Sequence, residues 1–126
     1  MLKPAAVLKA EAEEEHRLVL EAARRFADRV VAEFGAEAVY LFGSRARNDW
    51  HRGSDCDVIV VASCFEGTVS FERPVKMYRL WDGPGGIEPV VVTPAEFENA
   101  KGKRGLIDMA LQSGVMTLHG SEPVAG

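Results

Sequence analysis

The sequence is poor in the residues that would mark a secreted, membrane-spanning or broadly nucleic-acid-binding protein. It has only two cysteines, Cys56 and Cys64, in 126 residues. That is too few for a disulfide framework, and they lack the spacing of a zinc site. No apolar run approaches the ~18 residues of a membrane span, and the N-terminus lacks the apolar core of a signal peptide. We therefore expect a reduced, cytoplasmic protein with no membrane partner.

Positive charge is also scarce. Lysine and arginine total 15 against 19 acidic residues, which gives a formal net charge of −4. Broad, sequence-independent binding to nucleic acid needs a basic footprint, so we do not expect it. A local basic cluster at Arg45, Arg47 and Arg52 is still compatible with binding one nucleotide. Hydrophobic residues make up 47% of the chain, which suits a single domain over residues 1–126 with a real core.

One stretch, residues 43–61, carries most of the chemical information. The apolar run 38–42 leads into Gly43-Ser44, and a second apolar run follows Asp55 and Asp57. Side chains at positions i and i+2 of a strand point to the same face, so the two carboxylates are expected side by side. Such a pair can bind two hard cations about 3.5–4 Å apart, a common arrangement for in-line phosphoryl displacement.

The residues between the two runs fit a phosphate ligand. Gly43 lets the backbone approach closely, and Ser44 adds a hydroxyl group. Arg45 and Arg47 carry planar guanidinium groups that suit phosphate oxygens. Taken alone, Gly-Ser-Arg is a common loop, and Asp-x-Asp before a strand is often a solvated turn. It is the order of these features along the chain that indicates one phosphate and metal site.

The rest of the chain alternates between helical and extended patterns. Val19, Ala23, Phe26 and Val30 step at helical spacing in a segment without internal glycine or proline, which ends at Gly35. The expected helices cover residues 7–34, 44–49, 70–81, 94–101 and 106–112. The expected strands cover residues 37–42, 56–62, 87–92 and 115–118.

A third carboxylate stands at the start of the third expected strand. Glu88 precedes Thr93-Pro94 by five residues, and Thr93 to Glu96 reads as a capping box. The capping box gives Glu96 a structural role at the start of the helix. Glu98, the other competing acid, lies on the same helix, whereas Glu88 lies on the strand. Pro89 favours an edge strand or the start of a strand, because proline has no backbone N–H to donate to a fully paired ladder.

Together, the strand, Gly43-Ser44, the spacer, Asp55-x-Asp57 and the second strand resemble the signature of the DNA polymerase beta-like nucleotidyltransferase superfamily. The variant Gly-Ser-Arg-x-Arg resembles the minimal nucleotidyltransferase branch, which includes the antitoxin partners of HEPN-domain toxins. The resemblance covers nearly the whole chain. It implies an α/β (α+β) fold, a small mixed β-sheet flanked by α-helices.

The resemblance also implies a function. Asp55, Asp57 and Glu88 would be the catalytic residues and the ligands of two Mg²⁺ ions, and Gly43, Ser44, Arg45 and Arg47 would hold the triphosphate of ATP. The enzyme would transfer AMP to a hydroxyl of a partner protein, a HEPN toxin. Two other functions stay open: a non-catalytic module that neutralises a toxin or binds a nucleotide with a relict site, and an enzyme acting on a small molecule.

Overall fold

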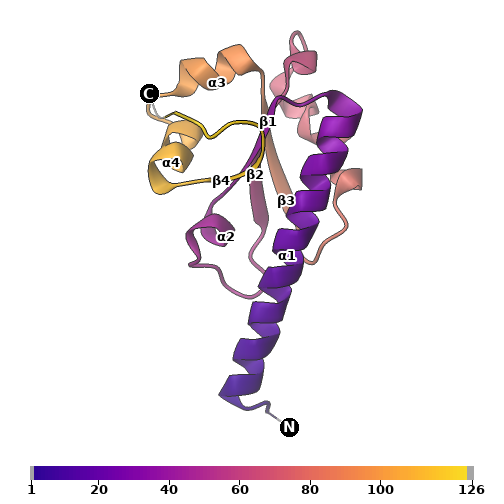
Figure 1. The fold of residues 1–126 in the computed structure, drawn as a ribbon, viewed down its shortest axis with the longest axis vertical. Coiled ribbons are helices and arrows are strands. Elements are labelled where there is room, and N and C mark those ends of the chain that lie inside the picture. Colours follow the sequence, from indigo (N-terminus) through magenta and orange to yellow (C-terminus); the bar gives the residue numbers. More distant parts are fainter. Residues whose placement is uncertain (1, 125–126) are drawn as a thin grey trace.

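The computed structural model describes residues 2–124 as a mixed four-stranded sheet with helices on both faces (Figure 1). The strands lie in the order β3-β2-β1-β4, and β1 is antiparallel to both of its neighbours, whereas β2 and β3 are parallel. The strands are β1 (Ala38–Phe42), β2 (Cys56–Val61), β3 (Ile87–Val92) and β4 (Met116–His119). The helices are α1 (Ala5–Phe34), α2 (Ser44–Arg47), α3 (Pro94–Ala100) and α4 (Leu106–Ser113). The expected α/β architecture is confirmed.

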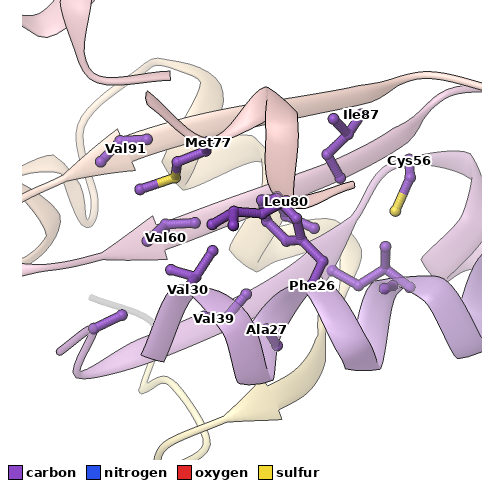
Figure 2. Packing of buried hydrophobic residues seen from close by; sticks show 14 of the residues in the cluster. Phe26, Ala27, Val30, Val39, Cys56, Val60, Met77, Leu80, Ile87 and Val91 are labelled. Carbon is purple, nitrogen blue, oxygen red and sulfur yellow. The ribbon is translucent and has the colours of Figure 1, made fainter. Parts of the chain in front are cut away.

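Helix α1 covers one face of the sheet with the apolar stripe expected from the sequence. Val19, Phe26 and Val30 are completely buried, and Gly35 ends the helix in the left-handed conformation at φ 65°. Figure 2 shows Phe26 and Val30 packing in one cluster with Val60 of β2 and Val91 of β3. The buried positions of α1 begin only at Val19, and the N-terminal half of the helix extends beyond the sheet (Figure 1).

The second face of the sheet packs against α3 and α4. Tyr40 of β1 stacks on Phe97 of α3 with ring centroids 5.6 Å apart, and Ile59 of β2 joins Ile107 of α4 in the same cluster. Side chains alternate between the two faces of a strand. Asp57, two residues before Ile59, therefore lies on the α3–α4 face.

The helix expected over residues 70–81 is wrong. The structure has three short 3₁₀ turns there, Ser70–Glu72, Pro74–Lys76 and Tyr78–Leu80. The helical spacing of Phe71, Val75 and Tyr78 does not mark a buried stripe, because these side chains are 75%, 67% and 50% exposed. Met77 and Leu80 are the residues buried against α1 and the sheet.

A buried arginine explains why this segment is irregular. Arg73 is 4% exposed and donates hydrogen bonds to the carbonyl oxygens of Thr68 and Val91 and to the carboxylate of Glu96. The next residue, Pro74, has no N–H to continue a helical ladder. The segment therefore follows the partners of Arg73 rather than one helical axis.

Two local predictions about β3 and α3 are confirmed. Strand β3, which contains Pro89, lies at an edge of the sheet. The capping box at the start of α3 is complete: Thr93 N–H donates to Glu96 Oε1 at 2.8 Å, and Glu96 N–H donates to Thr93 Oγ1 at 3.2 Å.

The two cysteines are free, as expected. Cys56 is 1% exposed and packs in the α1 cluster, and burial raises the pKa of its thiol to about 12. Cys64 is exposed. Among residues 2–124, no helix combines the length and the apolar character that a bilayer crossing requires.

Candidate active site

The turn after β1 places the backbone directly against a carboxylate of β2. Gly43 has φ 75° and ψ −158°, a conformation open essentially to glycine alone. A Cβ atom at Gly43 would lie 2.3 Å from Asp57 Oδ2, so any side chain at this position would displace the Asp57 carboxylate. The sequence predicted that Gly43 would allow a close approach to a ligand. In the structure, the group that it approaches is Asp57.

Asp57 and Glu88 lie side by side on the parallel strands β2 and β3, where they are direct register partners. Register partners on adjacent strands project to the same face, with the strands about 4.8 Å apart. Asp55 precedes β2, and a Cβ at Gly86 would come within 2.9 Å of Asp55 Oδ1, so this acid lies against the loop that enters β3. The structure thus brings all three predicted acids to one end of the β2–β3 pair.

The pKa of Asp57 reflects its burial and its acidic neighbours. Partial burial raises the pKa of Asp57 to about 6, with further contributions from the negative charges of Glu88 and Asp55. Arg47 acts in the opposite direction, and no hydrogen bond within residues 2–124 offsets the shift. A site with uncompensated carboxylates is one that favours binding of a cation.

The donor chemistry of these acids suits Mg²⁺, which prefers carboxylate oxygens. The structure describes no group of three or more His, Cys, Asp or Glu side chains already arranged around a metal position among residues 2–124. The carboxylates therefore fit a hard cation in charge and in ligand type, and they would have to move together to enclose one.

A pocket of about 310 Å³ opens beside Asp57. Gly43, Ser44 and Arg47 line one side of it, and the opposite wall comes from α4, with Leu106 and Met109 at its surface. Met109 is 68% exposed. The sequence predicted the α4 helix. It did not predict that α4 packs beside the Gly43 turn and lines this pocket. A larger pocket of about 670 Å³ lies along α1 and contains none of the three site acids, so we do not assign the chemistry to it.

Arg45, predicted as a triphosphate ligand, occupies a different place. Its side chain is 1% exposed and points towards α1. It donates to Glu15 Oε1 at 3.0 Å and to the Ser54 carbonyl oxygen at 3.0 Å, and it lies 3.1 Å from His16 Nδ1. With its donors committed to the protein, Arg45 is not presented to a ligand in the pocket. Sequence adjacency to Ser44 could not reveal this, because it depends on how α1 packs.

Arg47 is the arginine that lines the pocket. Its side chain is 42% exposed, and its only ion pair among the described residues is with the exposed Asp49 at 3.2 Å. Trp50, which follows Asp49, stacks on the His16 ring with centroids 4.5 Å apart and lies against Arg45. This tryptophan therefore has a packing role.

Comparisons with known proteins place the chain in a class. Residues 23–115 match the model of the nucleotidyltransferase domain family, and the chain belongs to this family. The match includes the Gly43–Asp57 stretch and Glu88, so the fold and the three acids belong to the matched region. The family resemblance expected from the sequence is confirmed at this level.

A solved structure agrees with the fold. A crystal structure described as a "putative nucleotidyltransferase" from Sulfolobus solfataricus is 29% identical, covers 70% of this chain and 78% of its own, and superimposes with a TM-score of 0.59. A structure described as a toxin–antitoxin with AMP-PNP is 14% identical, with coverages of 79% and 74% and a TM-score of 0.45. Among curated proteins, no match to this chain was found.

Proposed function

We propose that this chain transfers AMP from ATP to a hydroxyl group of a partner protein. We further propose that the partner is a HEPN toxin, which the chain neutralises as an antitoxin. The observation that carries the transfer reaction is the pairing of Asp57 with Glu88, beside a pocket lined by Gly43, Ser44 and Arg47. The choice of a HEPN partner rests on the resemblance of Gly-Ser-Arg-Ala-Arg to the minimal nucleotidyltransferase branch.

In the proposed reaction, the oxygen of the acceptor hydroxyl attacks the α-phosphorus of ATP. A new O–P bond forms, the bond from the α-phosphorus to the bridging oxygen of the β-phosphate breaks, and pyrophosphate leaves. Glu88 accepts the hydroxyl proton, since it is an exposed acid beside Asp57. Arg47 and Ser44 hold the triphosphate against the turn, where positioning supplies much of the rate.

Asp55 and Asp57 would serve as metal ligands, and Glu88 would also complete the second metal site. With a pKa of about 6, Asp57 is mostly ionised at neutral pH and can serve as a ligand. Bound by these carboxylates, two Mg²⁺ ions would neutralise the charge of the phosphates and make the acceptor hydroxyl more acidic. The position of the three acids at one end of the β2–β3 pair supports this assignment of roles.

The dimensions of the site support a macromolecular acceptor. The pocket of about 310 Å³ is at the small end of ligand sites, and one nucleotide would occupy most of it. The four other pockets that the structure describes contain none of the three site acids. A hydroxyl on the surface of another protein can reach such an open site without an acceptor pocket.

The test uses ATP labelled at the α-phosphate, a purified HEPN protein encoded beside this chain, and Mg²⁺. We expect the label on the HEPN protein with the wild type, and a rate about 10²–10⁴ lower with Glu88→Gln, with ATP binding retained. The matched control is Glu98→Gln, which removes an exposed acid of α3 and should keep the wild-type rate. Equal labelling by Glu88→Gln would refute the role of Glu88. Label found only on RNA or a small molecule would refute the protein acceptor.

A further inference from the structure

The loop between the two halves of the site is attached to α1 by a small network around the buried Arg45. Residues 48–55 connect α2 to β2, with Ser44 before the loop and Asp55 at its end. Arg45 donates to the Ser54 carbonyl oxygen through Nε at 3.3 Å and through a terminal nitrogen at 3.0 Å. The residues that follow Ser44 and precede Asp55 are therefore bonded to each other.

Glu15 of α1 holds this loop from the other side. Its Oε1 accepts a hydrogen bond from Arg45 at 3.0 Å and one from the Gly53 N–H at 2.7 Å, and its Oε2 lies 3.8 Å from Arg52 Nε. The Gly53 N–H, and then Arg45, lower the pKa of Glu15, so this carboxylate stays charged at neutral pH. Glu15 thus contacts Arg45 and two residues of the loop, Arg52 and Gly53.

Two aromatic side chains complete the network. The guanidinium carbon of Arg45 lies 5.2 Å from the centre of the Trp50 ring, and Trp50 stacks on His16. Burial and the charge of Arg45 lower the pKa of His16. The neutral ring can therefore accept a hydrogen bond from Arg45 at Nδ1.

We propose that Glu15 and Arg45 form a positioning pair, which fixes the distance between the Ser44 turn and Asp55 so that phosphate and metal ligands meet. Neither residue touches the nucleotide. This inference rests on the proposed function for its substrate, and it assigns a role to an α1 residue that has no motif around it. A displacement of about 1 Å in such a site can lower the rate about 10²-fold.

The chain offers a matched control pair. Arg73 and Glu96 form another bridge in which a nearly buried arginine meets a glutamate that also accepts a backbone N–H, from Thr93. Arg73 bonds the Val91 carbonyl, at the opposite end of β3 from Glu88, so this bridge lies away from the site. Removing the negative charge from Glu15 or from Glu96 should lower thermal stability to a similar degree, and only the first change should affect nucleotide transfer.

The experiment compares Glu15→Gln, Glu15→Ala and Glu96→Gln in melting temperature, in binding of a non-hydrolysable ATP analogue with Mg²⁺, and in transfer rate. We expect kcat/KM to fall about tenfold for Glu15→Gln and about 10²-fold for Glu15→Ala, with a higher Mg²⁺ requirement for analogue binding. Glu96→Gln should keep wild-type values for both. Equal behaviour of the Glu15 and Glu96 variants in binding and rate would overturn the inference.

A double-mutant cycle separates positioning from direct contact. If Glu15 and Arg45 act as one bridge, the double variant Glu15→Ala/Arg45→Lys should lose little more than the worse single variant. If Arg45 instead binds phosphate, Glu15→Ala would release it and strengthen analogue binding, while Arg45→Lys would weaken it. Strengthened binding in Glu15→Ala would therefore refute the positioning role.

Fluorescence tests the pair without any reaction. The chain has two tryptophans, so a Trp81→Phe background leaves Trp50 as the reporter of the loop. Glu15→Ala should shift the emission of Trp50 to the red as the loop leaves α1, whereas Glu96→Gln should not. An unchanged spectrum in Glu15→Ala refutes the inference even if the wild type transfers no nucleotide. An inactive wild type with the expected red shift would refute only the proposed function.

Discussion

Replacing Asp57 with asparagine should stabilise the metal-free protein at neutral pH, although it removes a residue of the proposed site. Burial and the charges of Glu88 and Asp55 raise the pKa of Asp57 to about 6 from its ordinary value of 3.8. The folded chain therefore binds this proton more tightly than the unfolded chain does. Its contribution to stability is fully present below pH 3.8 and is lost as the pH rises through about 6.

The size of the effect follows from the two pKa values. At about 1.4 kcal/mol per pKa unit, the difference between 3.8 and about 6 corresponds to roughly 3 kcal/mol. Asp57 is only partly buried, and solvent screening reduces the figure to about 1–2 kcal/mol. For a chain of this length, Asp57→Asn should then raise the melting temperature at pH 8 by about 4–8 °C.

The assay is thermal unfolding from pH 3.5 to pH 8 in the presence of EDTA. The gain should shrink as the pH falls and should vanish near pH 4, where the wild-type carboxyl is protonated too. Added Mg²⁺ should then stabilise the wild type more than Asp57→Asn, because the cation requires the ionised carboxylate.

Asp82→Asn is the control of opposite sign, since hydrogen bonds from Arg25 and Arg29 lower the pKa of Asp82 to about 2. Its removal should therefore destabilise the protein at pH 8. The electrostatic reasoning would be refuted if Asp57→Asn melted at the wild-type temperature at pH 8 in EDTA, or if its gain persisted unchanged at pH 4.

Three further predictions follow from the placement of single side chains. Arg47→Ala should weaken binding of an ATP analogue more than Arg25→Ala, because Arg47 lines the pocket and Arg25 pairs with Asp82 away from it. Equal losses of affinity in calorimetry would show that overall charge is responsible instead. Phe26→Ala should cost about 3–5 kcal/mol in a urea titration, since its ring is completely buried, and a loss under 1 kcal/mol would contradict the packing described. A thiol reagent should label Cys64 at once and Cys56 only on unfolding, as mass spectrometry of the native protein would reveal.

Much of this protein is specified locally. The stripe of α1 from Val19 to Val30, the capping box at Thr93 and the edge position of Pro89 all follow from side-chain periodicity or from missing donors, which act within a few residues. The order Gly43-Ser44, Asp55 and Asp57 was also sufficient to indicate the nucleotidyltransferase domain family. Each of these signals is readable because its physical cause lies within one segment.

The failure at residues 70–81 shows where local patterns stop. The spacing of Phe71, Val75 and Tyr78 fits a helix equally well whether or not these side chains are buried. What decides the conformation is the buried Arg73, whose partners, among them Glu96, come from segments up to 23 residues away. No property of the segment itself encodes those partners.

The residues proposed to carry the chemistry can be named from the sequence, but their partners follow from packing between distant segments. Asp57 and Glu88 are 31 positions apart, and the parallel register of β2 and β3 makes them neighbours with a shared, repulsive charge. Arg45 and Arg47 look equivalent in sequence, but α1 supplies Glu15 to one of them and leaves the other at the pocket. Residue type determines the chemistry that a side chain can perform, whereas packing between distant segments determines its partners. A guanidinium group that is already bonded to a carboxylate has few N–H donors left for a ligand.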